Sequence, residues 1–317
     1  MDDWNPRPPP YELPSPSSIM AGMETAAVPG QVEAAGQVEA PASGTMTVRV
    51  LRAGLESRFE QEDHVAVEGP LEYMLQHPML GPEPISFGTT MRTPGDDENL
   101  AVGLLYGEGI VNQAGDIDAI ESSTRRPNVV NVRLRPEVRF DLPPPTRRFS
   151  AGSSCGVCGT TGLDAAIARA AATRIAGGDA VELPTLLSLP QIMRARQSKF
   201  GDTGGVHAAA LFDFSGNLQD IAEDVGRHNA LDKLVGRNLL AGRLPLKESI
   251  VLLSGRASFE LVQKALRAGV AVLASIGAPS SLAVNLARAS GLTLAGFLRP
   301  TQCNVYSNLQ RLGAARN

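Results

Sequence analysis

The feature that most constrains the fold is a regular alternation of short apolar runs and helical segments after residue 200. The apolar runs at 206–212, 249–253 and 270–276 are rich in Val, Leu, Ile and Ala, which is the pattern of strands buried on both faces. The segments between them have the length and periodicity of helices. Strands that alternate with helices are typical of a three-layer α/β sheet, so we predict that architecture for the second half of the chain.

Local signals predict where these helices begin. Pro is favoured in the first turn of a helix, and Gly or Ser is favoured as the cap before it. After Gly226, apolar residues recur at helical spacing from Ala230 to Leu239, which indicates a face packed in the core. The predicted helix starts are Leu189-Pro190, Gly226-Arg227, Ser258 and Pro279-Ser280.

The first half of the chain is dominated by strand-like runs, each bounded by Gly, Pro or Asn. Thr93-Pro94 precedes three acidic residues and an apolar segment at 100–105, so it predicts a capped helix start. This mixture predicts a smaller α+β domain. The predicted strands are residues 45–51, 71–75, 85–91 and 129–134.

Proline-rich stretches divide the chain. Residues 1–45 contain many prolines and show no apolar periodicity, so we expect a disordered extension there. The run Leu-Pro-Pro-Pro-Thr at 142–146 indicates a boundary. We therefore predict a two-domain protein, with an N-terminal α+β domain at 46–145 and a C-terminal α/β domain at 146–317.

Composition excludes several functional classes. Lys and Arg number 29 against 33 Asp and Glu, and aromatic residues make up only 4% of the chain, which argues against a general nucleic-acid binder. The most apolar stretch, 268–287, is interrupted by Pro279 and polar residues, so no membrane span is expected. The first residues lack the basic start and apolar core of a secretory signal, so we expect a cytoplasmic protein.

Two of the three cysteines lie in one motif, Cys155-Gly156-Val157-Cys158, flanked by Gly, Ser and Thr. A single pair plus one further Cys does not make a secreted disulfide framework. Glycine flanks indicate a loop and disfavour a pair of ordinary core thiols. Because cations lower a thiol pKa, the nearby Arg147 and Arg148 favour a reactive thiol. Three hypotheses stay open: half of a zinc site, a redox dithiol, and a nucleophile that carries sulfur as a persulfide.

A zinc site would need two further ligands, and His207 is the best candidate in the sequence. Zinc deaminases have His-x-Glu upstream of Pro-Cys-x-x-Cys. Here the order is reversed, Ala209 stands in place of that Glu, and Ser154 stands in place of the Pro. We therefore exclude deamination, and we retain His207, His228 and Asp224 as candidate acids or bases, with a core role as the alternative.

Glycine-containing junctions at 204–207, 223–229 and 254–258 adjoin predicted strands or helices. In open α/β sheets such junctions form a ligand crevice, and Gly-Arg beside a helix start suits a phosphate. A Walker loop and a Gly-x-Gly-x-x-Gly motif are both missing, so ATP hydrolysis and NAD chemistry have no support. We predict a nucleotide- or phosphate-binding crevice, with Arg256 and His228 as candidate contacts.

Seven short motifs run in order from about residue 46 to 310. They are Met91-Arg92-Thr93-Pro94-Gly95-Asp96-Asp97, Gly107-Glu108-Gly109-Ile110, residues 153–159, Thr203-Gly204-Gly205-Val206-His207-Ala208-Ala209, residues 223–229 with Asp232-Lys233, Ser254-Gly255-Arg256, and Asn304-Val305-Tyr306. Together they resemble one family, the formate dehydrogenase accessory sulfurtransferases of the FdhD type. The set is far more specific than the Cys-x-x-Cys motif alone.

The resemblance implies a cytoplasmic homodimer with a cytidine-deaminase-like fold but without deaminase chemistry. It implies that the protein takes sulfur from a cysteine desulfurase and passes it to the bis(molybdopterin guanine dinucleotide) molybdenum cofactor, which is needed by formate dehydrogenase. It makes Cys155 the persulfide carrier and Cys158 a supporting thiol, and Cys303 is expected to be incidental. No structural metal is expected. The implied cofactor contacts are Phe297, Leu298, Arg299, Pro300, Thr301 and Gln302.

Two other functions remain as alternatives. The first is a chaperone that binds the molybdenum cofactor without transferring sulfur. The second is a zinc or redox dithiol module, which would bind metal through Cys155 and Cys158.

Overall fold

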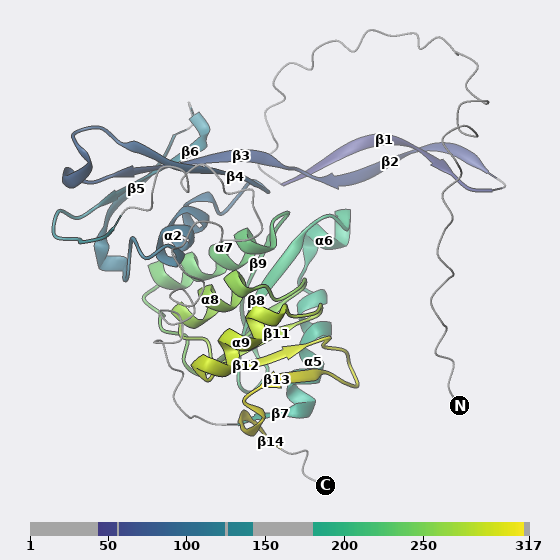
Figure 1. Ribbon diagram of the computed structural model, residues 1–317. Coiled ribbons are helices and arrows are strands. Elements are labelled where there is room, and N and C mark those ends of the chain that lie inside the picture. The colour runs from purple at the N-terminus through teal and green to yellow at the C-terminus, as the bar shows by residue number, and fades with distance from the viewer. Residues whose placement is uncertain (1–43, 56, 124–125, 142–179, 314–317) are drawn as a thin grey trace, which may run out of the picture. The chain divides into compact units, whose positions relative to one another are not determined.

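A computed structural model of the chain contains a six-stranded sheet in its second half (Figure 1). The structure describes residues 44–55, 57–123, 126–141 and 180–313. The strand order is β13-β12-β11-β10-β8-β9, and only β10, β11 and β12 run parallel to one another. The strands are β8 (His207–Asp213), β9 (Leu218–Asp224), β10 (Ser249–Leu253), β11 (Val272–Ser275), β12 (Thr293–Gly296) and β13 (Asn304–Ser307).

Helices cover both faces of this sheet because alternate residues along each strand point to opposite sides. Ala209, Leu211 and Val251 join a core cluster with the helices on one face. Ala210 and Leu252 join a second cluster with α5 (Leu183–Arg194) on the other face. The helices of the first cluster are α7 (Arg227–Leu240), α8 (Phe259–Arg267) and α9 (Ser281–Ser290). The sheet therefore lies between two apolar layers.

The first half forms a four-stranded sheet with the order β4-β3-β6-β5, in which β3 and β6 are parallel. Its buried strand residues contact the helix α2 (Asp97–Gly107) within the larger core cluster. The predicted mixture of helices and strands is confirmed, as a mixed α/β fold with several sheets. The strands are β3 (Gly69–Gln76), β4 (Ile85–Arg92), β5 (Ile117–Ser123) and β6 (Arg126–Leu134).

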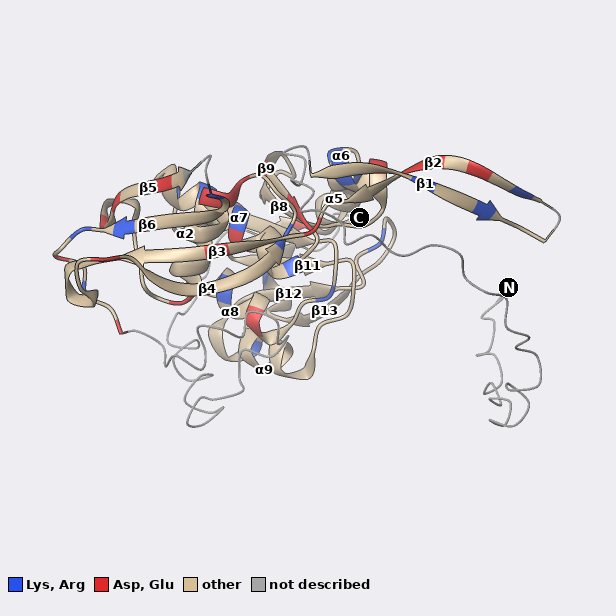
Figure 2. Cartoon of the chain, turned by 90° about the horizontal axis from the view of Figure 1, so that it is seen from above, with Lys and Arg blue, Asp and Glu red and all other residues tan. Residues whose placement is uncertain are grey.

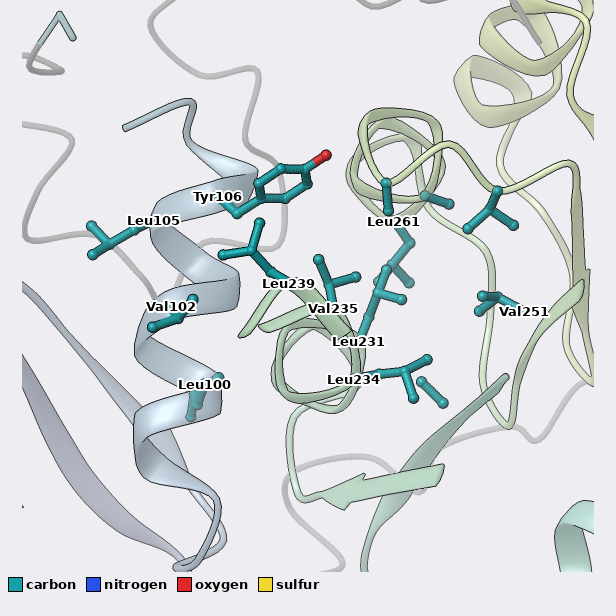
Figure 3. Packing of buried hydrophobic residues seen from close by; sticks show 14 of the residues in the cluster. Leu100, Val102, Leu105, Tyr106, Leu231, Leu234, Val235, Leu239, Val251 and Leu261 are labelled. Atoms are coloured by element: carbon teal, nitrogen blue, oxygen red, sulfur yellow. The ribbon is translucent and has the colours of Figure 1, made fainter. Parts of the chain in front are cut away.

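The two halves pack together through α2 and α7 (Figure 3). Leu100 and Tyr106 of α2 belong to the same buried cluster as Leu231 of α7. Two glycines let the helix backbones touch. A Cβ on Gly103 would lie 1.9 Å from the Asp232 carbonyl oxygen, and a Cβ on Gly236 would lie 1.9 Å from that of Asn99. Only glycine fits at either position of this crossing.

Three predicted helix starts are confirmed. Gly226 is the N-cap residue of α7, and the hydroxyls of Ser258 and Ser280 accept a backbone hydrogen bond in the first turns of α8 and α9. These side chains satisfy N–H groups that have no partner within the helix.

Two predicted helix starts are wrong. The helix after Thr93 begins at Asp97, because Thr93 is held by the loop before α7 and by α7 itself: its Oγ1 accepts from the Val225 N–H, and its carbonyl accepts from Lys233. The helix expected at Pro190 begins earlier, at Leu183, with Pro190 inside it. A different residue, Pro184, is the proline near the start of that helix.

The remaining elements are short or stand apart from the two large sheets. Strands β1 (Thr45–Ala53) and β2 (Arg58–Ala66) form a separate two-stranded ribbon. The short strands β7 (Val181–Glu182) and β14 (Leu312–Gly313) pair with each other, and α6 (Ser198–Thr203) follows α5. No helix in the described ranges is long and apolar enough to cross a membrane. The predicted extension before residue 44 and the predicted boundary near 145 lie outside the described residues.

Candidate functional site

The predicted crevice residues meet along one edge of the six-stranded sheet. Strands β10, β11 and β12 are parallel, so their carboxyl ends and the loops after them lie at the same edge. Strand β8 is antiparallel to β10, so its first residue, His207, lies beside the end of β10. Strand β9 ends at this edge with Asp224, three residues before the first residue of α7. Elements that are distant in sequence therefore place their polar residues together.

Backbone hydrogen bonds join the loops of this edge. The Gly277 N–H donates to the Gly255 carbonyl at 3.0 Å, and the Phe297 N–H donates to the Gly277 carbonyl at 3.0 Å. A Cβ on Gly277 would lie 2.9 Å from the Gly255 carbonyl oxygen. The loops after β10, β11 and β12 are thus held close together. A side chain at residue 277 would prevent this close approach.

The stretch 297–302 follows β12 directly and is largely exposed. Phe297 is 42% exposed and has a φ of +52°, a left-handed conformation that is strained for a bulky residue. Arg299 closes a turn, because its N–H donates to the Gln302 carbonyl at 2.9 Å. Leu298 is buried in the core, whereas Pro300 and Thr301 are exposed. The backbone strain and the exposure both fall in the stretch that the family resemblance implies for cofactor contacts.

Arg299 donates hydrogen bonds to backbone carbonyls of the protein itself. Its Nη1 donates to the carbonyls of Ile276 at 2.8 Å and Leu298 at 2.9 Å. The guanidinium therefore positions the loops after β11 and β12, and its other nitrogens make no hydrogen bond within the described chain. Arg256 is exposed, and the described residues offer it no ion pair.

His207 packs against the glycine that begins the loop after β10. Its ring atoms lie 3.2 Å from the position a Cβ on Gly255 would take, and its Nδ1 lies 3.5 Å from Ser254 Oγ. Burial and then the charge of Arg227 lower the pKa of His207, while Asp224 opposes them. The imidazole is therefore neutral near pH 7 and can donate or accept a hydrogen bond.

His228, the second residue of α7, lies between α7 and α8. Its Nε2 is 3.3 Å from Ser258 Oγ and 3.4 Å from a carboxylate oxygen of Glu260. Burial and the nearby charges of Lys264 and Arg227 lower its pKa to about 3. A neutral His228 connects the start of α7 to the cap of α8.

Arg227 is a further cation at this edge. It lies in the junction at 223–229, but it was not predicted to be a ligand contact. Its Nε is buried and has no hydrogen-bond partner among the described residues. It is also the first residue of α7, where free backbone N–H groups favour an anion. The Gly226-Arg227 pair before a helix was the signal in the sequence that could have identified it.

A cleft of about 440 Å³ adjoins this edge. His207, Ser254 and Ile276 form its inner wall, and residues of α5 and α6 form the outer wall. On the outer wall the Arg194 guanidinium lies 4.3 Å from the centre of the Phe200 ring. The cleft therefore combines a neutral imidazole, a hydroxyl, an aromatic ring and a cation.

Two acidic residues of the 223–229 motif serve the structure. The Glu223 carboxylate accepts from the N–H groups of Lys199 and Phe200, which fixes the start of α6 and with it the cleft wall. Asp224 is completely buried and forms an ion pair of 2.7 Å with Lys233. Asp224 also accepts from the Thr93 and Gly226 N–H groups, which leaves it no access to a substrate.

The motif at 91–97 is likewise structural. Arg92 binds both carboxylate oxygens of Asp97, at 2.9 and 2.8 Å, and the Met91 carbonyl accepts from Asn229. Together with the contacts of Thr93, these bonds join the end of β4 to the start of α7. Much of the motif set therefore fixes the position of α7, whose first residues form the candidate site.

The two loop cysteines, Cys155 and Cys158, lie outside the described residues. Cys303 is described: it is half-buried, and burial raises its pKa, so it is a poorer nucleophile than an ordinary thiol. In the described part of the chain, no group of three or more His, Cys, Asp or Glu side chains could hold a metal.

Comparisons with known proteins identify the family. Residues 72–313 match the model of the FdhD/NarQ family. A "Sulfur carrier protein FdhD" of Streptomyces avermitilis is 49% identical over 79% of this chain and 89% of its own length. The same name belongs to a Mycobacterium tuberculosis protein, 43% identical over 83% of this chain and 97% of its own length.

A solved structure is also similar. It is described as a putative formate dehydrogenase accessory protein from Desulfotalea psychrophila, and it is 26% identical with a TM-score of 0.64. The similarity covers 84% of this chain and 99% of that one. The sequence resemblance is thus confirmed, and the chain belongs to the FdhD/NarQ family.

Proposed function

We propose that this protein is a cytoplasmic sulfur carrier that serves formate dehydrogenase. It accepts sulfur from a cysteine desulfurase as a persulfide on Cys155 and delivers it to the bis(molybdopterin guanine dinucleotide) molybdenum cofactor. The observation that carries the proposal is the Cys155-x-x-Cys158 pair in a chain that is 49% identical to a protein named as a sulfur carrier.

Thiol chemistry accounts for the loading step. The thiolate of Cys155 attacks the terminal sulfur of the donor persulfide, the donor S–S bond breaks, and the donor leaves as a thiolate. Cys155 then holds the persulfide. Cys158 either tunes this thiol or attacks the inner sulfur, which releases sulfide and leaves a disulfide between the two cysteines.

The sheet edge supports the cofactor half of the proposal. A guanine dinucleotide carries pyrophosphates, and the edge offers the first residues of α7, the exposed Arg256 and the Arg227 Nε, which has no partner among the described residues. Phe297 and the turn at 299–302 lie exposed beside them. His207 and His228 are neutral and would act as hydrogen-bonding groups rather than as cations.

We also propose the cytidine-deaminase-like arrangement for the six-stranded sheet and its two helical layers. Deamination is not part of the proposal, because the position of the deaminase Glu is taken by Ala209, which is completely buried in β8. A sulfur carrier needs no such acid.

Restoring formate dehydrogenase activity tests the proposal. In cells that lack their own copy of the gene, the wild-type chain is expected to restore activity, and Cys155→Ser is expected to fail at an equal protein level. Guanosine diphosphate binding by the same variant is the control, because the sheet edge is intact. A Cys155→Ser protein that restores full activity would favour a chaperone that binds the cofactor without sulfur transfer. Stoichiometric zinc on the wild type would favour the metal-binding dithiol.

A further inference from the structure

The cleft beside α5 and α6 contains a side-chain amide without a partner. Gln197 lies between the two helices, lines the cleft and is only 6% exposed. Its side chain makes no hydrogen bond within the described chain, yet its amide atoms are not among the fully buried atoms that lack a partner. The amide therefore opens into the cleft. A largely buried amide without a protein partner is costly, so a ligand that bonds to it is favoured.

The cleft also contains a cation whose donors are available. Arg194 is the last residue of α5, a helix that carries no other charged residue (Figure 2). Its guanidinium lies 4.3 Å from the centre of the Phe200 ring, an attraction that restrains it. The Arg194 side chain makes no ion pair or hydrogen bond within the described part of the chain. Because the guanidinium is planar and donates in its own plane, stacking on a ring leaves its N–H groups for a ligand.

The remaining lining of the cleft suits a flat, uncharged ring. Pro190, Met193 and Phe200 contribute apolar surface, and His207 contributes a neutral imidazole. None of the lining residues is Asp or Glu. The volume of about 440 Å³ lies within the range of about 300 to 1,000 Å³ that is usual for small-ligand clefts. An anionic group is therefore not needed to fill the cleft, and an aromatic heterocycle fits it.

The cleft adjoins the sheet edge that we propose for phosphates. Ser254 and Ile276 line the cleft, and the residues after them, Gly255 and Gly277, are joined by a backbone hydrogen bond of 3.0 Å. The Arg227 Cδ lies 4.0 Å from the position that a Cβ on Gly255 would take. A ring bound in the cleft is thus next to the groups proposed for its phosphates.

The two unpartnered groups match one edge of a 2-amino-4-oxopyrimidine ring. This ring has a carbonyl oxygen, which accepts, beside a ring N–H, which donates. A guanidinium only donates, whereas an amide both donates and accepts. Arg194 can therefore bond to the carbonyl while the Gln197 amide oxygen accepts from the ring N–H. Adenine has an amino group in place of this carbonyl, so it would turn a donor toward the donors of Arg194.

We propose that this cleft binds a 2-amino-4-oxopyrimidine ring and that Arg194 and Gln197 select it. The inference rests on the proposed function, because the bis(molybdopterin guanine dinucleotide) cofactor contains this ring in its guanine and in its pterin parts. The two residues act on the specificity for the ring, and the sheet edge acts on the phosphates.

Nucleotide specificity tests the inference. Isothermal titration calorimetry of the full chain measures the affinities for guanosine diphosphate and adenosine diphosphate, which have the same phosphates and differ in the base. We expect the wild type to bind guanosine diphosphate at least tenfold more tightly. Arg194→Met and Gln197→Leu keep apolar surface but remove the polar group. Each should weaken the binding of guanosine diphosphate at least tenfold and leave the affinity for adenosine diphosphate unchanged.

Arg196→Gln is the matched control, because it removes the charge of an exposed arginine that lies two residues after Arg194 and does not line the cleft. Its affinities for both nucleotides should equal those of the wild type. Unchanged thermal unfolding of all variants shows that they fold.

Neopterin, which has the same ring without a phosphate, distinguishes the two parts of the cofactor. Competition with guanosine diphosphate that is lost in Arg194→Met assigns the cleft to the pterin as well as to guanine. Without competition, loss of guanosine diphosphate binding in the two variants assigns it to guanine alone.

Two results overturn the inference and leave the proposed function standing: a wild type that binds both nucleotides equally, and cleft variants that keep the wild-type ratio of affinities. A wild type that binds neither nucleotide nor neopterin overturns the inference together with the cofactor half of the proposed function.

Discussion

Among the single residues of the candidate site, Arg227 is the best placed to contact an anion. Arg299 already donates to the carbonyls of Ile276 and Leu298, and Arg256 projects into solvent. Arg227 instead has a buried Nε with no acceptor in the described chain, at the start of a helix. A buried donor without a partner is costly, and a bound phosphate would supply the missing acceptor.

We predict that Arg227→Gln weakens the binding of guanosine diphosphate by about ten- to a hundredfold, because a hydrogen bond to a charged group contributes about 1.5 to 3 kcal/mol. Isothermal titration calorimetry measures the affinity. Lys247→Gln is the control, since Lys247 precedes β10 and so lies toward the opposite edge of the sheet. Equal affinities for Arg227→Gln and the wild type would remove Arg227 from the site.

His228 gives a prediction about pH. Its pKa falls from 6.5 to about 3 on folding, mainly because it is buried. Between pH 6.5 and about pH 3 the unfolded chain binds a proton at His228 that the folded chain does not bind. His228 therefore makes the protein lose stability as the pH falls through this range.

Relative to His228→Gln, the wild type should therefore lose about 2 kcal/mol of unfolding free energy between about pH 7 and about pH 5. Asp232 contributes in the opposite direction, and the comparison cancels its contribution because both proteins contain it. Burial raises the pKa of Asp232 to about 6, although Lys264 lies beside it. Urea unfolding at each pH provides the numbers. Parallel pH profiles of the two proteins would show that the pKa of His228 is ordinary.

At the scale of elements, the crossing of α2 and α7 depends on two glycines. A methyl group on Gly103 or Gly236 would overlap the backbone of the opposite helix. Side chains can rotate away from a clash, but two helix backbones can only separate, and separation would open the core between them.

We predict that Gly103→Ala and Gly236→Ala each lower the unfolding free energy by about 3 kcal/mol. Gly201→Ala in α6 is the matched control, because a Cβ there meets nothing within 4 Å. That control should be neutral or slightly stabilising, since Ala is less flexible than Gly in the unfolded chain. Chemical denaturation compares the three variants, and a stable Gly103→Ala protein would show that the helices are not in backbone contact.

The sequence predicted elements well where the local pattern decides the structure. Residues 249–253 form β10 with the predicted bounds, because a strand buried on both faces is a continuous apolar run. Strand β9 was not predicted, because it lies at the sheet edge and mixes polar with apolar residues. The helix start at Thr93 was predicted wrongly, because contacts with residues more than a hundred positions away determine the conformation of Thr93.

The candidate site was predictable in part for the same reason. The glycine junctions indicated a crevice, and the structure brings the loops at 255, 277 and 297 together through backbone bonds. The sequence could not show that Arg299 supports these loops or that Asp224 is an internal anchor. Both roles depend on which partners the fold brings near.

At the scale of the whole described unit, a buried polar contact joins the end of β4 to α7. Asp224 and Lys233 form its ion pair, and Thr93 bonds to both side chains. Because the pair is buried, removing one partner leaves an uncompensated charge in the core.

We predict that Lys233→Met lowers the unfolding free energy by about 3 to 5 kcal/mol. The double variant Asp224→Asn with Lys233→Met should recover part of this loss, because no charge then stays unpaired. Thermal and urea unfolding of both proteins test this. A double variant less stable than Lys233→Met would show that the hydrogen bonds of Asp224, and not the charge balance, dominate the contact.

The central claim is that Cys155 carries sulfur, and peptide mass spectrometry tests it most directly. The protein is incubated with a cysteine desulfurase and cysteine, its thiols are trapped by alkylation, and the peptides are analysed. We predict one added sulfur atom on the peptide that contains Cys155 in the wild type, and none on the same peptide of Cys155→Ser. A wild type without added sulfur, or Cys155→Ser that retains it in full, would contradict the account.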